Sequence, residues 1–293
     1  MISEELIRTS ILLKEQWYEG IEEAWKNFSN DKNIDVVLKI LNGLHEKMKN
    51  KPESLSEIAF HQNFGAEIAS AGTWLEHYSK TKEDICLHQA FDIYYQLYRK
   101  INTKLENLKT VHLENVSPKL LQTKNCEISV PGLYKTKSPI IKIAGFQPRL
   151  PVLTSKQHPR KLCIYGSDCK EYHYLLKGHE DLRQDERVMQ LFSLVNRLLN
   201  NKPETEKKDL TITTYSVIPL STNTGLIGWV QNSDTLQQLI REYRKNNNIR
   251  NETEGNLMQT MCSKYDNLCL ANKVEIFRNV LENTKVRMCN VFS

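Results

Sequence analysis

Apolar residues in the first third of the chain repeat with the period of an α-helix. In four stretches they return at spacings of three and four residues, so each stretch would carry one apolar stripe. Pro52 separates the second stretch from the third, where Ser54 and Glu57 form an S-x-x-E capping box. We therefore expect an all-α four-helix bundle over residues 3–105. The four stripes are Trp17, Ile21, Ala24 and Phe28; Ile34, Val37, Leu38, Leu41, Leu44 and Met48; Phe64, Ile68, Ala71, Leu75 and Tyr78; and Leu87, Phe91, Tyr94, Leu97, Tyr98 and Ile101.

The pattern changes after about residue 110, where short, partly alternating segments lie between Pro, Gly and Ser residues. Such segments are typical of antiparallel strands. One long helix should interrupt them, opening with the acidic residues Glu180 and Asp181. The predicted fold class is thus α+β, with a sheet-and-helix domain over residues 106–230 and further helices over 231–293. The expected strands are Glu127–Val130, Ile140–Ala144, Lys161–Tyr165, Glu171–Leu176 and Leu210–Ile218; the long helix would turn Val188, Phe192, Val195 and Leu199 inward; the last helices would span Asp234–Arg244, Glu254–Met261 and Leu270–Leu281.

Charge and cysteine content narrow the classes of protein to consider. The 40 Lys and Arg residues against 35 Asp and Glu give a net charge of +5. This is no nucleic-acid signature, although a basic face for anionic phospholipids stays open. No apolar run reaches the ~18 residues that cross a bilayer, and the acidic start lacks a signal-peptide pattern. The seven cysteines form no C-x-x-C pair, so we expect reduced thiols and no metal site. We also expect a cytoplasmic location; a larger parent kinase could in addition associate with membranes or enter the nucleus.

The segment YLLKGHEDLRQDER, which starts at Tyr174, carries the clearest candidate chemistry. A strand would deliver Lys177, Gly178 would turn the backbone, and an acidic helix start would follow. A lysine at a strand end can bind the α- and β-phosphates of a nucleotide when a carboxylate holds it in place. Either Asp185 or Glu180 could supply that carboxylate. The alternative is an ordinary surface salt bridge, the usual meaning of a bare K-x-x-E spacing.

The run LLKGHEDLRQDERVMQLF, residues 175–192, resembles the ATP-lysine region of the phosphatidylinositol-3-kinase-related protein kinases, and among them of the TOR family. Residues 154–161 are similar to the TOR phosphate-binding loop, and residues 218–230 to its hinge. The resemblance implies a PI3/PI4-kinase-like small lobe that leads into a truncated large lobe, with ATP as cofactor. It also implies that backbone groups of Gly228 and Val230 form hydrogen bonds with adenine and that the Trp229 ring stacks on it. The implied ATP-binding residues are Lys177, Glu180, Asp185, Ser155, Gln157, Tyr215, Ile227, Gly228, Trp229, Val230 and Thr235.

The predicted bundle is similar to the FKBP–rapamycin-binding (FRB) domain of TOR kinases, through residues 19–24 and 89–95. The resemblance implies that it restricts access to the catalytic cleft and recruits protein substrates. Where the family groove has a small serine, this chain has Trp25; Phe91 and His88 replace a tryptophan and a threonine. A bulky indole should clash with the macrolide, so we expect weak or absent binding of FKBP–rapamycin. The implied groove residues are Ile21, Trp25, Phe28, His88, Phe91, Asp92, Tyr95 and Tyr98.

Kinase chemistry also needs a catalytic Asp and ligands for Mg²⁺, which the TOR family keeps in a G-D-R-H-P-S-N loop and an I-D-F-G-D segment. Neither string occurs here, and the resemblance ends near Asn283, before the tail Thr284–Ser293. We expect part of a TOR-type serine/threonine kinase that is inactive alone and meets TOR-complex subunits through its parent. Without most of the large lobe, the last helix should expose its apolar stripe. The alternatives are a truncated, non-catalytic binding module that acts through the bundle, and a lipid kinase, against which the bundle argues.

Overall fold

The computed structural model describes residues 1–31, 33–134, 136–155 and 157–283. Lys156 of the predicted phosphate loop and the tail Thr284–Ser293 lie outside these residues. The chain divides into two compact units, Met1–Trp229 and Val230–Ser293. The three domains predicted from the sequence remain a prediction, while the α+β class is confirmed: helices come first, followed by a sheet and more helices.

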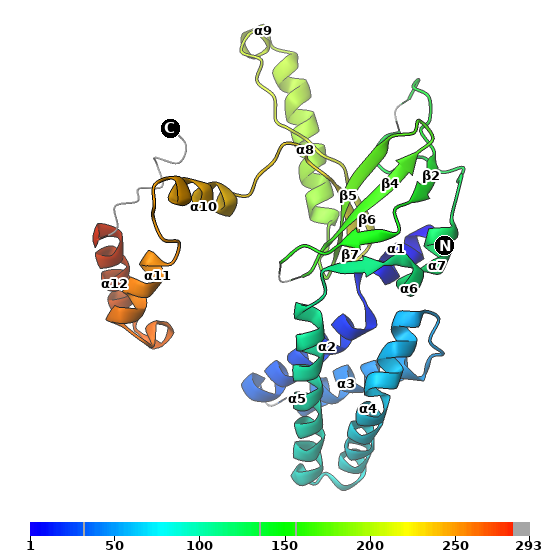
Figure 1. The fold of residues 1–293 in the computed structure, drawn as a ribbon, viewed down its shortest axis with the longest axis vertical. Helices are drawn as coiled ribbons and strands as arrows, with labels where there is room; N and C mark the ends of the chain where they lie inside the picture. Colours follow the sequence, from blue (N-terminus) through cyan, green and yellow to red (C-terminus); the bar gives the residue numbers. More distant parts are fainter. Residues whose placement is uncertain (32, 135, 156, 284–293) are drawn as a thin grey trace. The chain divides into compact units, whose positions relative to one another are not determined.

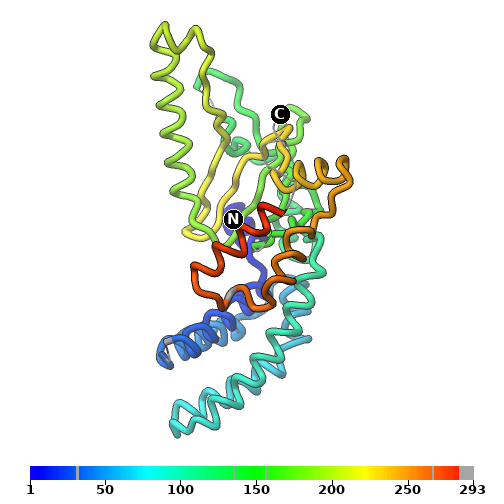
Figure 2. The backbone as a smooth tube through the Cα atoms, turned by 90° about the vertical axis from the view of Figure 1, so that its left-hand side faces the viewer, coloured from blue at the N-terminus to red at the C-terminus, as the bar shows by residue number. Residues whose placement is uncertain are grey.

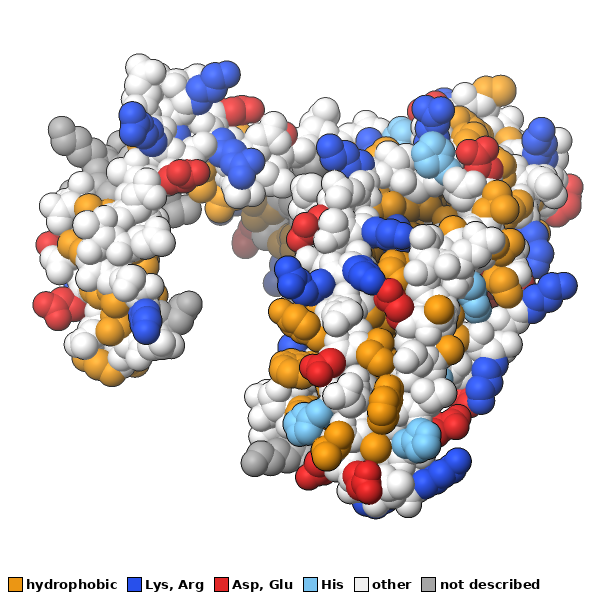
Figure 3. Space-filling model, turned by 60° about the horizontal axis from the view of Figure 1, so that its bottom comes forward, with side chains coloured by type: hydrophobic (Ala, Val, Ile, Leu, Met, Phe, Trp, Pro, Cys, Tyr) orange, Lys and Arg blue, Asp and Glu red, His pale blue; other side chains and the backbone are white. Residues whose placement is uncertain are grey.

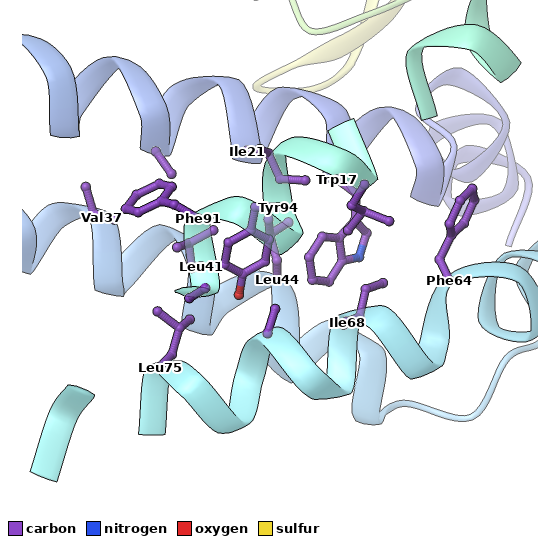
Figure 4. Close-up of a cluster of buried hydrophobic side chains, with 14 of the residues drawn as sticks. Trp17, Ile21, Val37, Leu41, Leu44, Phe64, Ile68, Leu75, Phe91 and Tyr94 are labelled. Carbon is purple, nitrogen blue, oxygen red and sulfur yellow. The ribbon is translucent and has the colours of Figure 1, made fainter. Parts of the chain in front are cut away.

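The four predicted bundle helices are present, and their apolar stripes form one core. Trp17 is fully buried at its centre, and Figure 4 shows it among Ile68 and Phe64 from the facing helix. The Ser54 hydroxyl accepts a hydrogen bond from the Glu57 N–H, as a capping box requires. The Glu57 carboxylate, however, accepts from the Glu53 N–H rather than from Ser54. The helices are α2 (Leu13–Lys26), followed by a π-helical turn (Asn27–Asp31), α3 (Ile34–Lys49), α4 (Leu55–Thr81) and α5 (Asp84–Glu106).

A fifth N-terminal helix, α1 (Ile2–Ser10), was not predicted from the sequence. Its Leu6 and the following Leu12 belong to the core beneath the sheet, not to the bundle core. Figure 1 accordingly shows α1 beside the sheet, close to the short helices α6 (Leu113–Val116) and α7 (Pro118–Gln122). The chain therefore enters the sheet domain first, builds the bundle, and then returns to the sheet domain.

Five antiparallel strands form the sheet of the first unit, in the order β2-β4-β5-β7-β6. Three predicted strands are wrong in extent: the one expected at Ile140–Ala144 runs over Ile143–Phe146 instead. Residues 127–130 contribute only a bridge between Ser129 and Lys142, and the last predicted strand begins at Val217, because the chain before it runs along a helix instead. The strands are β2 (Ile143–Phe146), β4 (Arg160–Gly166), β5 (Glu171–Gly178), β6 (Val217–Ser221) and β7 (Thr224–Gly228); β1 (Thr110–His112) pairs separately with β3 (Arg149–Pro151).

The long helix α8 (Arg183–Asn200) buries none of its residues among those the structure describes. Of the predicted inward stripe, Val188 is 41% exposed, whereas Phe192, Val195 and Leu199 are partly buried. The helix also begins at Arg183, after the acidic pair that was expected to open it. Asn196 exchanges hydrogen bonds with the backbone of Ile212, and Figure 2 shows the returning chain beside the helix. The short helix α9 (Pro203–Glu206) lies between them in sequence.

The described part of the second unit, residues 230–283, contains three helices at the predicted places. They are α10 (Leu236–Asn246), α11 (Thr253–Met261) and α12 (Leu270–Asn283), with a short 3₁₀ turn at Tyr265–Asn267. The Arg244 guanidinium pairs with the Glu254 carboxylate at 2.7 Å. The apolar stripe of α12 is exposed, as expected: Leu270, Val274, Phe277 and Leu281 are 77, 42, 50 and 54% accessible. No helix in the described ranges is long and apolar enough to cross a membrane.

A buried ion pair joins the bundle to the sheet. Arg160, at the start of β4, donates to the Glu15 carboxylate of α2, and their side chains are 0% and 4% exposed. The same carboxylate accepts from the Leu12 N–H, while Arg160 also donates to the His158 carbonyl at 2.6 Å. The pair thus fixes three things together: the first turn of α2, the start of β4 and the loop that precedes it.

We expect Arg160→Met to lower the free energy of unfolding by about 3–5 kcal/mol, because it leaves Glu15 buried without its partner. Urea unfolding followed by circular dichroism measures the change. The control is Arg183→Met, which breaks an exposed ion pair with Asp181 and should lower stability by at most about 1 kcal/mol. Equal effects of the two variants would contradict the prediction.

Candidate functional site

One face of the sheet packs on the core, and the other face carries both polar and apolar side chains. Side chains alternate between faces along a strand, and Leu162, Tyr174 and Leu176 belong to the core. Their neighbours therefore lie on the other face. In register these are Lys161 opposite Leu175, Leu175 opposite Ile227, and Lys177 opposite Gly225. Lys177 and Ile227, both predicted to bind ATP, thus lie on the same face of the sheet.

Lys177 is paired with Glu180, one of the two carboxylates proposed from the sequence. Both side chains are partly buried, at 24% and 32% exposure. The other candidate, Asp185, is exposed in the first turn of α8. Next to Glu180, Asp181 accepts hydrogen bonds from the Arg183 side chain and backbone, and these bonds lower the pKa of Asp181 to about 2.

The turn after the lysine differs from the sequence-based expectation. His179, not Gly178, takes the left-handed conformation, with φ of 64°. Its ring lies 2.5 Å from the Glu19 carboxylate of α2, and this contact joins the turn to the bundle. Gly178 is needed for a different reason: a Cβ there would lie 2.5 Å from Cγ1 of Ile11 and 2.9 Å from the Ser10 carbonyl oxygen. The glycine lets the backbone after α1 approach the strand closely.

The hinge segment continues the sheet at the end of β7. The Gly228 N–H donates to the Ser216 carbonyl at 2.7 Å, and the Trp229 N–H donates to the His173 carbonyl at 2.9 Å. The Gly228 N–H is therefore already engaged, which leaves its carbonyl to serve a ligand. The Lys161 ammonium lies 4.4 Å from the centre of the Trp229 ring, a cation–π contact.

The other residues predicted to line the nucleotide pocket fall into different settings. Extending the β6–β7 register by two residues brings Tyr215, 37% exposed, across from Trp229. Val230 and Thr235 belong to the second unit. There the Thr235 hydroxyl accepts from the Gln238 N–H and caps α10, so Thr235 has a structural role whatever its part in binding.

Ser155 and Gln157 of the predicted phosphate loop lie beside the bundle. Together with His158 and His179 they line a pocket of about 540 Å³, and Lys177 is not among its lining residues. The bundle side of this pocket is acidic, through Glu15, Glu19, Glu22 and Glu23 of α2 and Glu106 of α5. His158 takes φ of 44° in a tight turn closed by its N–H to the Ser155 carbonyl.

On the bundle surface, Trp25, Phe28 and Phe91 form an aromatic cluster. Ring centroids lie 5.6 Å apart for Trp25 and Phe91 and 4.7 Å apart for Phe28 and Phe91, and His88 meets Phe28 edge-on. Trp25 is 48% exposed above the buried Phe91. A pocket of about 400 Å³ opens here, lined by Trp25, Phe28, Ser29, Ile34, Asp84, Leu87 and His88.

The other predicted groove residues lie around or away from this pocket. Ile21 is buried in the bundle core, while Asp92 and Tyr95 are exposed. Tyr98 instead stacks on Tyr18 at 4.6 Å and donates to its hydroxyl. In Figure 3, hydrophobic side chains lie in groups among polar ones on the bundle.

Sequence reasoning missed several residues that shape these sites: Lys161 over the hinge tryptophan, the Glu19 partner of His179, and the Glu15–Arg160 pair. Alternation along the strand places Lys161 on the correct face, but the contact with Trp229 depends on strand register. The two bundle glutamates gave no signal, because acidic residues on an amphipathic helix are usually solvated.

Two family profiles match the chain. The profile of the FKBP12-rapamycin binding domain matches residues 5–103, and that of the phosphatidylinositol 3- and 4-kinases matches residues 171–293. Among curated proteins, the serine/threonine-protein kinase TOR of Oryza sativa subsp. japonica and mTor of Drosophila melanogaster are each 48% identical over 285 residues. The DNA-dependent protein kinase catalytic subunit of Gallus gallus is 39% identical over 135 residues, 44% of this chain and 3% of its own length. The two TOR-type alignments cover 97% of this chain, which spans 12% of the length of those relatives.

Gly178→Ala should lower the free energy of unfolding by about 1–3 kcal/mol, because the new Cβ must displace the backbone at Ser10 and the side chain of Ile11. Denaturant unfolding tests this. The matched control is Gly65→Ala on α4, where a Cβ meets nothing within 4 Å and helix propensity should add about 0.5–1 kcal/mol. If Gly178→Ala is as stable as the unaltered chain, the proposed close approach is wrong.

Proposed function

Because the chain belongs to the TOR family of serine/threonine protein kinases, we propose that residues 1–229 combine its FRB bundle with the lobe that binds ATP. One observation carries the proposal. Lys177, paired with Glu180, shares a sheet face with Ile227, and Trp229 follows that strand directly. A cation held by a carboxylate, next to an apolar surface and an aromatic ring, suits a nucleotide with its phosphates and its base.

The residues present fit such a nucleotide at each of its parts. The Lys177 ammonium would bind the α- and β-phosphates, and Glu180 would hold it in position. Leu175 and Ile227, both partly exposed and directly opposite one another, offer an apolar surface for the base. The Gly228 carbonyl would accept a hydrogen bond from the adenine amino group, since the N–H of this residue is engaged within the sheet.

Phosphoryl transfer needs further groups that the 293 residues do not supply. ATP bound in kinases brings Mg²⁺, whose carboxylate and amide ligands sit in loops absent from this sequence. We therefore propose that this polypeptide, by itself, binds nucleotide without turning it over. Protein substrates and TOR-complex subunits would bind to the whole kinase, in which the bundle would recruit the substrate.

The second candidate function is binding through the bundle alone. It is favoured by the separate bundle core and by the aromatic pocket around Trp25 and Phe28. This function would need neither Lys177 nor the hinge. The two proposals thus differ in which variants should abolish binding. The predicted cytoplasmic location stays a prediction under both.

We expect Lys177→Ala to weaken ATP binding at least about tenfold, equivalent to about 1.4 kcal/mol, by removing the phosphate cation. Isothermal titration of the full chain measures the affinity. Lys170→Ala is the control, because Lys170 is exposed in the turn between β4 and β5. Equal affinity of the Lys177→Ala variant, or γ-phosphate transfer by the unaltered chain above that of Lys177→Ala, would contradict this proposal.

For the bundle, we expect no FKBP–rapamycin complex with the unaltered chain at micromolar concentrations, since Trp25 projects over the pocket floor. The double variant Trp25→Ser, Phe91→Trp should bind at least about tenfold more tightly, as measured by titration of the full chain. Leu55→Ser, at an exposed apolar residue of α4, is the control and should leave this binding unchanged. A nanomolar complex with the unaltered chain would refute the predicted clash.

A further inference from the structure

Three side chains of different chemistry meet on strands β4 and β5, away from Lys177. They are the thiol of Cys163, the carboxylate of Glu171 and the imidazole of His173, and one ligand atom of each lies within 4.8 Å of the others. Cys163 is 2% exposed, yet it belongs to neither hydrophobic core cluster. Its side chain lies on the face of the sheet opposite the core, which Lys161 and Leu175 share.

The strand register explains why these groups converge. Cys163 and His173 lie directly opposite one another. The His173 carbonyl accepts from the Trp229 N–H, on the β7 side, so His173 and Cys163 form a non-hydrogen-bonded pair, the kind with the closer side chains. Glu171 is two residues before His173 and therefore shares its face. The His173 Nε2 lies 3.4 Å from a Glu171 carboxylate oxygen.

The hydrogen bonding of the cluster is incomplete within the described residues. The His173 Nδ1 is buried and has no hydrogen-bond partner there, which is costly for a polar atom. Burial, with a smaller contribution from the charge of Glu171, raises the pKa of the Cys163 thiol to about 11. The thiol therefore stays protonated at neutral pH in the absence of a cation. Glu171 is 59% exposed, so water can reach the cluster from outside.

A thiolate, an imidazole and a carboxylate are the ligands that Zn²⁺ takes in proteins, at about 2.0–2.3 Å and in tetrahedral geometry. Ligand atoms already within 4.8 Å of one another need only small side-chain movements to reach those distances. The harder ions Mg²⁺ and Ca²⁺ fit less well, because they prefer oxygen ligands alone.

We propose that Cys163, Glu171 and His173 form a Zn²⁺ site, with water as the fourth ligand. On binding, a Zn–S bond forms and the thiol proton leaves to solvent, with no change of oxidation state. The sequence alone predicted no metal site, because the Cys and His lie ten residues apart and meet only through strand pairing. The proposal is independent of nucleotide binding, although the site adjoins the backbone that holds Trp229.

Competition with a chromophoric zinc chelator tests the site in the full chain, purified under reducing conditions and freed of metal. We expect one Zn²⁺ per chain, with affinity at least about tenfold lower in Cys163→Ala and in His173→Ala. Replacement by Co²⁺ should give a thiolate-to-metal charge-transfer band that Cys163→Ala abolishes. The matched control is Cys169→Ala, an exposed thiol in the turn that joins the same two strands.

Three results would overturn the proposal: no stoichiometric Zn²⁺ binding, unchanged affinity in both ligand variants, or an equal loss in Cys169→Ala. Circular dichroism of the metal-free variants must match that of the unaltered chain. If Cys163→Ala proves misfolded, Glu171→Gln provides a second test at an exposed position. It should lower Zn²⁺ affinity while leaving the buried residues in place, and unchanged affinity there would also overturn the proposal.

Discussion

The buried ion pair between Glu15 and Arg160 is the constraint on which the arrangement of the first unit depends. Two charges without solvent contact are stable only when each has well-placed partners, and here each has a second one: the Leu12 N–H for Glu15 and the His158 carbonyl for Arg160. The start of the bundle and the predicted phosphate loop are therefore held by the same two side chains. Any movement of α2 relative to β4 must break this pair or carry the loop with it. The contact between Glu19 and His179 adds a second link, from the same helix to the turn after Lys177.

Much of the fold could be predicted from the sequence, because burial on one side imposes a period on helices and strands. The stripes around Trp17 and Phe91 identified the bundle in this way, and the alternation in β4 and β5 identified the sheet. Two helices show the limit of such patterns. Helix α1 is short, and its partners are distant in sequence, so nothing local reveals where it packs. Helix α8 has a good apolar stripe, but a stripe says only that a face can be buried, not how completely its neighbours cover it.

The site was predictable where its chemistry is local and unpredictable where it depends on register. The sequence left Glu180 and Asp185 as alternative partners of Lys177, and the structure pairs the lysine with Glu180. For the turn that follows Lys177, the prediction from the same segment was wrong. Glycine was expected to adopt the unusual backbone angle, whereas His179 adopts it and Gly178 provides space. Contacts across strands, such as Lys161 with Trp229 or Cys163 with His173, follow from which residues face one another. That pairing is decided by the whole sheet and leaves no mark on either segment alone.

The early position of α1 in the chain has a consequence for synthesis. The Ser10 hydroxyl lies 3.0 Å from that of Thr224, a residue 214 positions later. Helix α1 is therefore synthesised before the bundle, and β7, the strand on which it docks, only after the bundle is complete. Domains generally fold as units during translation. The bundle can therefore fold while the apolar side of α1 is still exposed to solvent. The sheet domain can be completed only after β7 has been synthesised. Its assembly is therefore a late step, and the apolar side of α1 stays exposed until then.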